Sequence, residues 1–202
     1  MKAWPAHLLT LSLLLGGAWS LWQGGYIHAK AQLAQLLIAS AWSHTLQGER
    51  KVRPWPWADT WPVACLDVPR LAIRRFVLAG ASGSTLAFGP GQLFVPTPPQ
   101  ETIPTLIAGH RDTHFRFLKD LRPGDELRLQ TADGRTTRYR IEDLLIADAS
   151  DTALLQHDRD TSSLILITCY PFDALVPGGP LRYLVRARAI DETTPIKQGD
   201  TI

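Results

Sequence analysis

The segment ELRLQTADGRTTRYRIEDLL, residues 126–145, carries the clearest fold signal in this chain. It contains two runs, Glu126 to Thr131 and Arg135 to Leu145, that flank Ala132-Asp133-Gly134. Asp-Gly between two such runs is a strong signal for a β-hairpin, because both residues tolerate the backbone angles of a tight turn. We therefore predict two antiparallel strands joined at Asp133-Gly134.

Short apolar runs continue on both sides of this hairpin, separated by segments rich in Gly, Ser and Pro. Many short strands at close intervals, with few helices, indicate an all-β fold, and we expect a closed antiparallel barrel. Two short helical segments are expected between the strands, at 115–121 and 151–156. The other predicted strand regions are 64–78, 105–108, 163–168 and 181–190.

The N-terminal residues have a different composition. No Asp, Glu, Lys or Arg occurs between Lys2 and Lys30, and the stretch from Leu8 to Trp22 is rich in Leu. Such a stretch is long enough to span a bilayer of about 30 Å. The alternative is a cleaved signal peptide, with Ala29-Lys30-Ala31 as the cleavage site. Because the apolar stretch is long and its centre is far from that site, an uncleaved anchor over residues 1–29 is favoured.

Residues 30–63 are expected to form a helical stalk followed by a linker rich in Trp and Pro. Leucine and isoleucine recur at helical spacing between residues 33 and 38, and Gly48 is a candidate end of this helix. Prolines keep the segment Pro54 to Pro62 extended. Its three Trp side chains are expected to pin the linker to the barrel surface rather than to bind a ligand.

Composition excludes several classes of protein. The formal net charge is only +2, and the basic residues are scattered among acidic ones, so no nucleic-acid partner is predicted. Two cysteines exclude a disulfide-rich scaffold. Cys65 is expected to pack within the first strand. A bridge between Cys65 and Cys169 would block the candidate nucleophile described next and is not expected.

The strongest chemical signal is the apolar run Leu164-Ile-Leu-Ile-Thr-Cys169. A cysteine thiolate is a strong nucleophile, His110 in Ala108-Gly109-His110-Arg111 can carry a proton, and Arg182 can stabilise an oxyanion. The alternative is that Cys169 is a small apolar residue at the end of a core strand. Spacing alone leaves both interpretations open.

These segments together resemble the sortases, the cysteine transpeptidases of bacterial surfaces. Leu164–Cys169 resembles the Thr-Leu-x-Thr-Cys signature, with Ile165 in place of the first Thr, and Ala108–Arg111 resembles the segment of the catalytic His. Arg182 stands about where sortases place their catalytic Arg. The Trp-Pro stretch resembles the sortases of marine proteobacteria. The resemblance runs from 64 to 190 and includes Gly89-Pro90-Gly91, Phe117–Leu121 and Pro123-Gly124-Asp125.

The resemblance implies a sortase-like barrel of about eight strands over 64–190, a number compatible with an interior filled by side chains, followed by a tail over 191–202. Cys169 would attack the Thr–Gly amide of an LPxTG-like sorting signal on an exported protein, and an amine acceptor would resolve the thioacyl-enzyme. His110 would move protons and Arg182 would stabilise the oxyanion, with no cofactor. The subtype implies a single-pass protein of the inner membrane with its catalytic domain in the periplasm.

Two neighbours of these residues leave alternatives open. Thr168 either donates a hydrogen bond to substrate or satisfies the strand. His114 follows His110 by four residues, as in His-Glu-x-x-His, but Arg111 stands where the Glu is required, so no metal site is predicted.

Two other functions compete with the transpeptidase. The first is another cysteine enzyme of the cell envelope similar to the L,D-transpeptidases, whose Ser-x-Gly-Cys signature is absent here. The second is a non-catalytic exported β-barrel that binds a partner.

Overall fold

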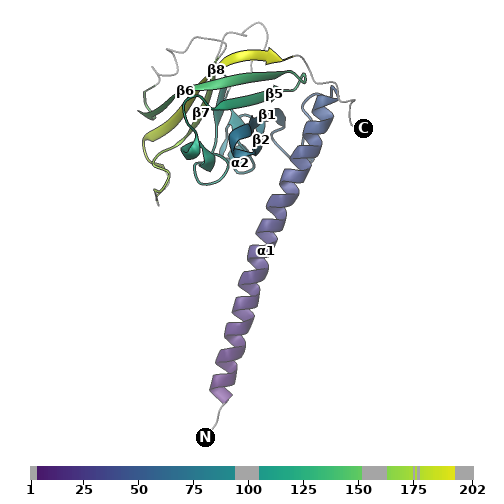
Figure 1. Ribbon diagram of the computed structural model, residues 1–202. Helices are drawn as coiled ribbons and strands as arrows, with labels where there is room; N and C mark the ends of the chain where they lie inside the picture. The colour runs from purple at the N-terminus through teal and green to yellow at the C-terminus, as the bar shows by residue number, and fades with distance from the viewer. Residues whose placement is uncertain (1–3, 94–104, 152–162, 175, 177, 194–202) are drawn as a thin grey trace. The chain divides into compact units, whose positions relative to one another are not determined.

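The computed structural model describes residues 4–93, 105–151, 163–174, 176 and 178–193 (Figure 1). The chain divides into two compact units, residues 1–37 and 38–202. In chain order the elements are α1 (Trp4–Leu46), β1 (Pro62–Val68), η1 (Pro69–Leu71), β2 (Ile73–Ala79), α2 (Gly83–Leu86), β3 (Gly91–Gln92), β4 (Thr105–Ala108), η2 (Arg116–Asp120), β5 (Glu126–Thr131), β6 (Thr136–Asp148), β7 (Ser163–Cys169) and β8 (Leu181–Thr193).

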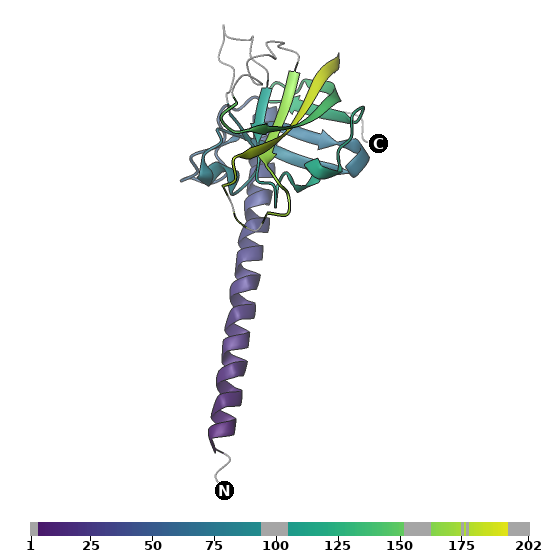
Figure 2. The same ribbon diagram turned by 90° about the vertical axis from the view of Figure 1, so that its left-hand side faces the viewer.

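The strands form a closed barrel in the order β1-β2-β3-β4-β7-β8-β6-β5. Figures 1 and 2 show this barrel in two views at 90°. The predicted eight-stranded closed barrel is confirmed. It is mixed rather than wholly antiparallel, because β2 pairs with β3 and β4 pairs with β7 in parallel. Parallel neighbours need a crossover connection instead of a tight turn. Here α2 lies between β2 and β3, and the β5–β6 hairpin lies between β4 and β7.

The predicted hairpin joins β5 to β6. The amide of Thr131 donates to the carbonyl of Arg135 over 2.9 Å, and the amide of Gly134 donates to the carbonyl of Thr131 over 2.9 Å. Gly134 has a φ of 81°, in the left-handed region that glycine adopts without a steric penalty. The turn at Asp133-Gly134 is therefore confirmed.

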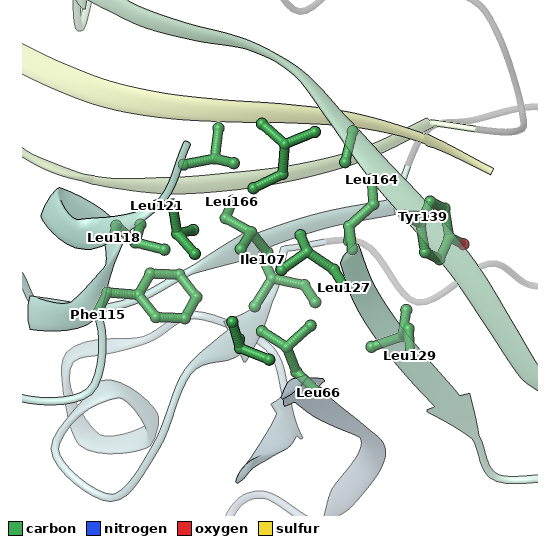
Figure 3. Close-up of a cluster of buried hydrophobic side chains, with 14 of the residues drawn as sticks. Leu66, Ile107, Phe115, Leu118, Leu121, Leu127, Leu129, Tyr139, Leu164 and Leu166 are labelled. Carbon is green, nitrogen blue, oxygen red and sulfur yellow. The ribbon is translucent and has the colours of Figure 1, made fainter. Parts of the chain in front are cut away.

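The barrel interior is filled by side chains from most strands and from η2 (Figure 3). Phe115 and Leu118, at η2, are fully buried and meet the strand residues Leu66, Ile107 and Leu166 in one cluster. The helical turn expected at 115–121 is thus present, with η2 as its regular part. The helix expected at 151–156 lies outside the described residues.

One helix, α1, runs through both the predicted anchor and the predicted stalk. It ends before Gly48, whose φ is 99° and whose amide donates to the carbonyl of Thr45 over 3.0 Å, so the predicted stop is confirmed. Within the unit 38–202, Ile38, Ala41 and Trp42 are buried. Among the described residues, no helix combines the length and the hydropathy that mark a membrane span.

The linker between α1 and β1 is fixed by two of its three tryptophans. Trp55 packs edge-on against Phe88 with the ring centroids 4.9 Å apart. The carbonyl of Trp61 accepts a hydrogen bond of 2.8 Å from the amide of Ala79 in β2. Trp57, in contrast, is 82% exposed. The expected pinning role is confirmed for the Trp55 side chain and is wrong for the exposed Trp57. Trp61 is held by its backbone, and its ring contacts the ammonium of Lys51 within the linker.

Strand β8 extends further than the sequence indicated. It continues to Thr193, and Asp191 pairs with Arg138 of β6. The first three residues of the segment expected to be a tail are therefore part of the barrel, and 194–202 lie outside the described residues.

Candidate active site

The parallel pair β4–β7 brings the His110 and Cys169 segments together. Ala108 is paired with Ile167, and beyond this pair the amide of Gly109 donates to the carbonyl of Ile167 over 3.1 Å. The hydroxyl of Thr168 donates to the carbonyl of Gly109 over 2.7 Å. His110 and Cys169 therefore leave neighbouring strands at the same end, each one residue beyond this pair of hydrogen bonds.

Gly109 sets the direction in which His110 points. A Cβ at Gly109 would lie 2.7 Å from the ring of Phe115, which is fully buried in the barrel core. The missing side chain of Gly109 thus faces the interior, and in an extended chain the next residue faces the other way. His110 accordingly lies on the outside of the barrel, where its side chain is exposed.

Cys169 and Arg182 are directly opposite each other on the antiparallel strands β7 and β8. The amide of Tyr170 donates to the carbonyl of Leu181 over 3.0 Å, so the Cys169–Arg182 pair is one of the pairs without ladder hydrogen bonds. In such pairs the Cβ atoms are about 4.5–5.5 Å apart and the side chains share a face.

That shared face is the outer one. Leu164 and Leu166 belong to the interior cluster, whereas Ile165 and Leu184 belong to a second, smaller cluster. Cys169 has the same strand parity as Ile165, and Arg182 the same parity as Leu184. The thiol, the imidazole and the guanidinium are therefore brought to one outer face at one end of the barrel, with Cys169 and Arg182 half-buried.

The two cysteines have different environments. Both are free thiols, so the predicted absence of a Cys65–Cys169 bridge is confirmed. Cys65 is buried in β1, and burial, with a smaller contribution from the charge of Asp67, raises its pKa to about 12. Cys65 is therefore a neutral thiol at physiological pH, as expected for a packing residue, and Cys169 is the accessible one.

Arg182 is oriented by the backbone at the start of its strand. Its Nη1 donates to the carbonyl of Gly179 over 2.7 Å and to that of Leu181 over 2.9 Å. Within the part of the chain that the structure describes, neither Nε nor Nη2 donates a hydrogen bond, although the charge of Arg182 contributes to lowering the pKa of Asp148. Two guanidinium nitrogens thus remain as hydrogen-bond donors for a ligand beside Cys169.

Thr168 and His114 are close in sequence to the candidate catalytic residues and have different environments. Thr168 is only 2% exposed and its hydroxyl proton is directed to Gly109, which favours its structural interpretation. His114 is partly buried, and burial lowers its pKa, as do the charges of Arg75 and His110, against a hydrogen bond with the backbone of Ala87 and the charge of Asp112. No group of residues suited to a metal ion occurs among those described.

Arg111 was not singled out from the sequence. It is only 9% exposed, and its Nη2 donates to the carbonyls of Ala174 and Val176 over 2.8 and 3.0 Å. It therefore ties the loop after Cys169 to the segment of His110. The only sequence feature that could have pointed to Arg111 is its position directly after His110. Its hydrogen-bonding role could not be predicted, because the carbonyl partners are more than sixty residues away in sequence.

Comparisons with known proteins support this reading of the fold. Sortase D of Bacillus subtilis (strain 168) is 33% identical over 125 residues, which cover 62% of each chain. A structure of the catalytic domain of SrtD from B. anthracis matches with a TM-score of 0.52 and 33% identity, covering 65% of this chain and 88% of that one. Sortase A from Corynebacterium diphtheriae matches with a TM-score of 0.57 and 25% identity, covering 71% and 66%.

The chain spans only 62% of the length of the curated relative that it matches. These relatives do not test the marine proteobacterial subtype, which stays a prediction. The family model that describes the sortase domain matches residues 66–190, the part of the chain that contains the candidate site and almost all of the barrel. By this match the chain belongs to the sortase family.

Proposed function

We propose that this chain is a cysteine transpeptidase that cleaves an LPxTG-like sorting signal on an exported protein and transfers the acyl group to an amine. The observation that carries this proposal is the placement of Cys169 opposite Arg182 and beside the strand end that bears His110, on one accessible face. A nucleophile, a proton carrier and an oxyanion donor are the groups that acyl transfer needs.

In the acylation step, the Cys169 thiolate attacks the carbonyl carbon of the scissile amide. The oxyanion that forms accepts hydrogen bonds from the Nε and Nη2 donors of Arg182, which have no partner among the described residues. As the carbon–nitrogen bond breaks, His110 gives its proton to the leaving amine. The products are a thioester on Cys169, a free amine and a neutral imidazole.

In the transfer step, the neutral His110 takes a proton from the acceptor amine while the amine nitrogen attacks the thioester carbon. The carbon–sulfur bond breaks and the Cys169 thiolate is restored beside a protonated His110. One proton leaves the imidazole in the first step and one returns in the second, so the enzyme is regenerated without a cofactor.

The outer face beside Cys169 supports an apolar sorting signal. Leu106, Ile165 and Leu184 form the small outer cluster, with Ile167, Leu145 and Ala147 packed against it. Leu106, Ile165 and Leu184 are buried, so an extended peptide bound next to Cys169 would place its apolar Leu-Pro portion toward the partly exposed Ile167, Leu145 and Ala147.

We also propose that the first part of α1 attaches the protein to the inner membrane and that the barrel acts in the periplasm. Support comes from the absence of charged residues between Lys2 and Lys30 and from several large apolar side chains exposed on the helix. These include Leu14, Leu21 and Trp22. Two results would support this location. The protein should stay with the membranes after a carbonate wash, and protease should reach the barrel only after the outer membrane is opened. Recovery in the soluble cytosolic fraction would contradict it.

The decisive experiment is mass spectrometry of the full chain incubated with an LPxTG-type peptide. A thioester adduct on Cys169 is expected, and Cys169→Ala should abolish it. Cys65→Ser is the matched control, because it removes the other thiol and should retain the adduct. His110→Ala and Arg182→Lys should each lose most turnover, on the order of a hundredfold or more for an oxyanion donor. An adduct that persists in Cys169→Ala would refute the proposal.

A further inference from the structure

A pocket of about 500 Å³ lies beside the candidate site and has no role in the steps described above. One wall comes from the segment after β4, with Arg111, Arg116 and Lys119, and the other from Tyr170–Asp173 after β7. We name it the end pocket. Arg111 directly follows His110, and Tyr170 directly follows Cys169. Because consecutive Cα atoms are 3.8 Å apart, both walls begin one residue from a reactive group.

The end pocket and the outer face are on different sides of the strand end. Tyr170 stacks on Tyr183 with the ring centroids 6.1 Å apart, and both Tyr183 and Phe172 pack against the interior cluster. Cys169, in contrast, has the outward parity of Ile165. A ligand in the end pocket would therefore reach the thioester from the side opposite to the sorting signal.

Arg111 gives this pocket a positive charge that no described carboxylate neutralises. It is nine-tenths buried, its Nη2 is bound only to neutral carbonyls, and its Nη1 has no partner within the described residues. It forms no ion pair with any carboxylate that the structure describes. A buried cation without an acidic partner is costly, and an anion bound in the pocket would offset that cost.

The rest of the lining carries charges of both signs. Arg116 and Lys119 are exposed and form no ion pair with a described residue, so both are available to a ligand. Asp112 and Asp173 are exposed and line the same pocket. Acidic and basic groups around one small cavity match a ligand that itself carries both an ammonium and a carboxylate.

From this arrangement, we infer that the end pocket binds the acceptor and selects an amine that carries a free carboxylate. The inference rests on the proposed transpeptidase function. Arg116 and Lys119 would hold the carboxylate, with Arg111 adding its charge, while the ammonium end lies toward Asp112 and the adjacent His110. The ammonium first loses one proton to solvent, and His110 takes a second proton as the free amine attacks the thioester carbon, so the reaction balances as described above.

The test compares two acceptors on the full chain, Gly-Gly and Gly-Gly amide, at equal concentrations of free amine. The thioacyl-enzyme is formed with an LPxTG-type peptide, and the two transfer products are quantified by mass spectrometry. The wild type should favour Gly-Gly by about tenfold, the effect of one charge-assisted hydrogen bond. In Arg116→Gln/Lys119→Gln the ratio should fall to within about twofold. Arg122→Gln/Arg140→Gln removes two exposed charges outside the lining and should keep the wild-type ratio.

A second measurement does not depend on catalysis. In full-length Cys169→Ala, Gly-Gly should shift the backbone amide resonances of Arg111 and Tyr170 saturably, and Gly-Gly amide should do so much more weakly. If no thioacyl-enzyme forms, the proposed function fails and this titration alone decides the pocket's role. Equal use of both acceptors, or equal shifts, would overturn the inference. If the acylation rate depended on a free carboxylate at the C-terminus of the sorting peptide, the pocket would bind the amine fragment that leaves during acylation. That result would also overturn the inference.

Discussion

The hydrogen bond from Thr168 to Gly109 joins the two strands that bear the nucleophile and the proton carrier, so its removal should affect both stability and rate. Thr168→Val keeps the shape of the side chain and removes the hydroxyl. The bond is 2.7 Å long and Thr168 is 2% exposed, so the carbonyl of Gly109 would lose a buried donor. An unsatisfied buried group costs about 1–3 kcal/mol, and the free energy of unfolding should fall by that amount.

The rate should fall by more than the loss of stability explains. Without the Thr168 hydrogen bond, the described contact that holds the Gly109–His110 segment to β7 is the hydrogen bond from the Gly109 amide to the carbonyl of Ile167. A displacement of about 1 Å at a reacting group can cost a hundredfold, and we expect thioacyl-enzyme formation to slow by about ten- to a hundredfold. Urea unfolding measures the first effect, and mass spectrometry under conditions where both proteins are folded measures the second.

Thr168→Ser is the matched control, because it keeps the hydroxyl and removes one buried methyl group. It should lose about 1 kcal/mol of stability and acylate at nearly the wild-type rate. If Thr168→Val were as stable as the wild type, the hydrogen bond would contribute nothing. If it were destabilised but acylated normally, the bond would hold the barrel without positioning His110.

Three further outcomes follow from individual contacts. Gly109→Ala should lose most activity and some stability, because its Cβ would lie 2.7 Å from a buried aromatic ring; acylation rate and urea unfolding check both effects. Hydrogen bonds from Arg138 and then Arg128 lower the pKa of Glu126 from 4.5 to about 2. Its contribution to stability is therefore complete above about pH 4.5 and is lost as the pH falls toward 2, and Glu126→Gln should flatten this part of the stability–pH curve. Cys65, with a pKa raised to about 12 by burial, should resist alkylation by iodoacetamide at pH 7 until the protein is unfolded, and peptide mapping of the alkylated protein would detect an exception.

The sequence predicted those parts of the fold that depend on neighbours in the chain. The Asp133-Gly134 turn, the short strand at 105–108 and the stop at Gly48 each follow from local backbone preferences. The parallel pairing of β4 with β7 does not, because these strands are separated by the β5–β6 hairpin and their alignment is decided by closure of the barrel. The exposure of Trp57 was missed for a similar reason, since the prolines of the linker do not show which indoles meet a partner.

The candidate site was predicted from motif resemblance, and the structure supplies what the motifs lack. Residues Cys169, His110 and Arg182 could be selected by type and order. Their common face depends on strand parity and register, which a one-residue shift would reverse. The role of Arg111 was not visible, because a basic residue beside a candidate His is usually solvated and its burial depends on the loop carbonyls of Ala174 and Val176.

The alternation of side chains at this strand end has a consequence for the proposed reaction. Each reactive residue that faces outward is followed by one that lines the end pocket: Arg111 follows His110, and Tyr170 follows Cys169. On the proposed assignments, the sorting signal occupies one side of the thioester and the acceptor reaches it from the other. The acceptor can then bind while the acyl chain still occupies the outer face. A separate acceptor pocket raises the local concentration of amine at the thioester, which favours transfer to the amine over hydrolysis by water.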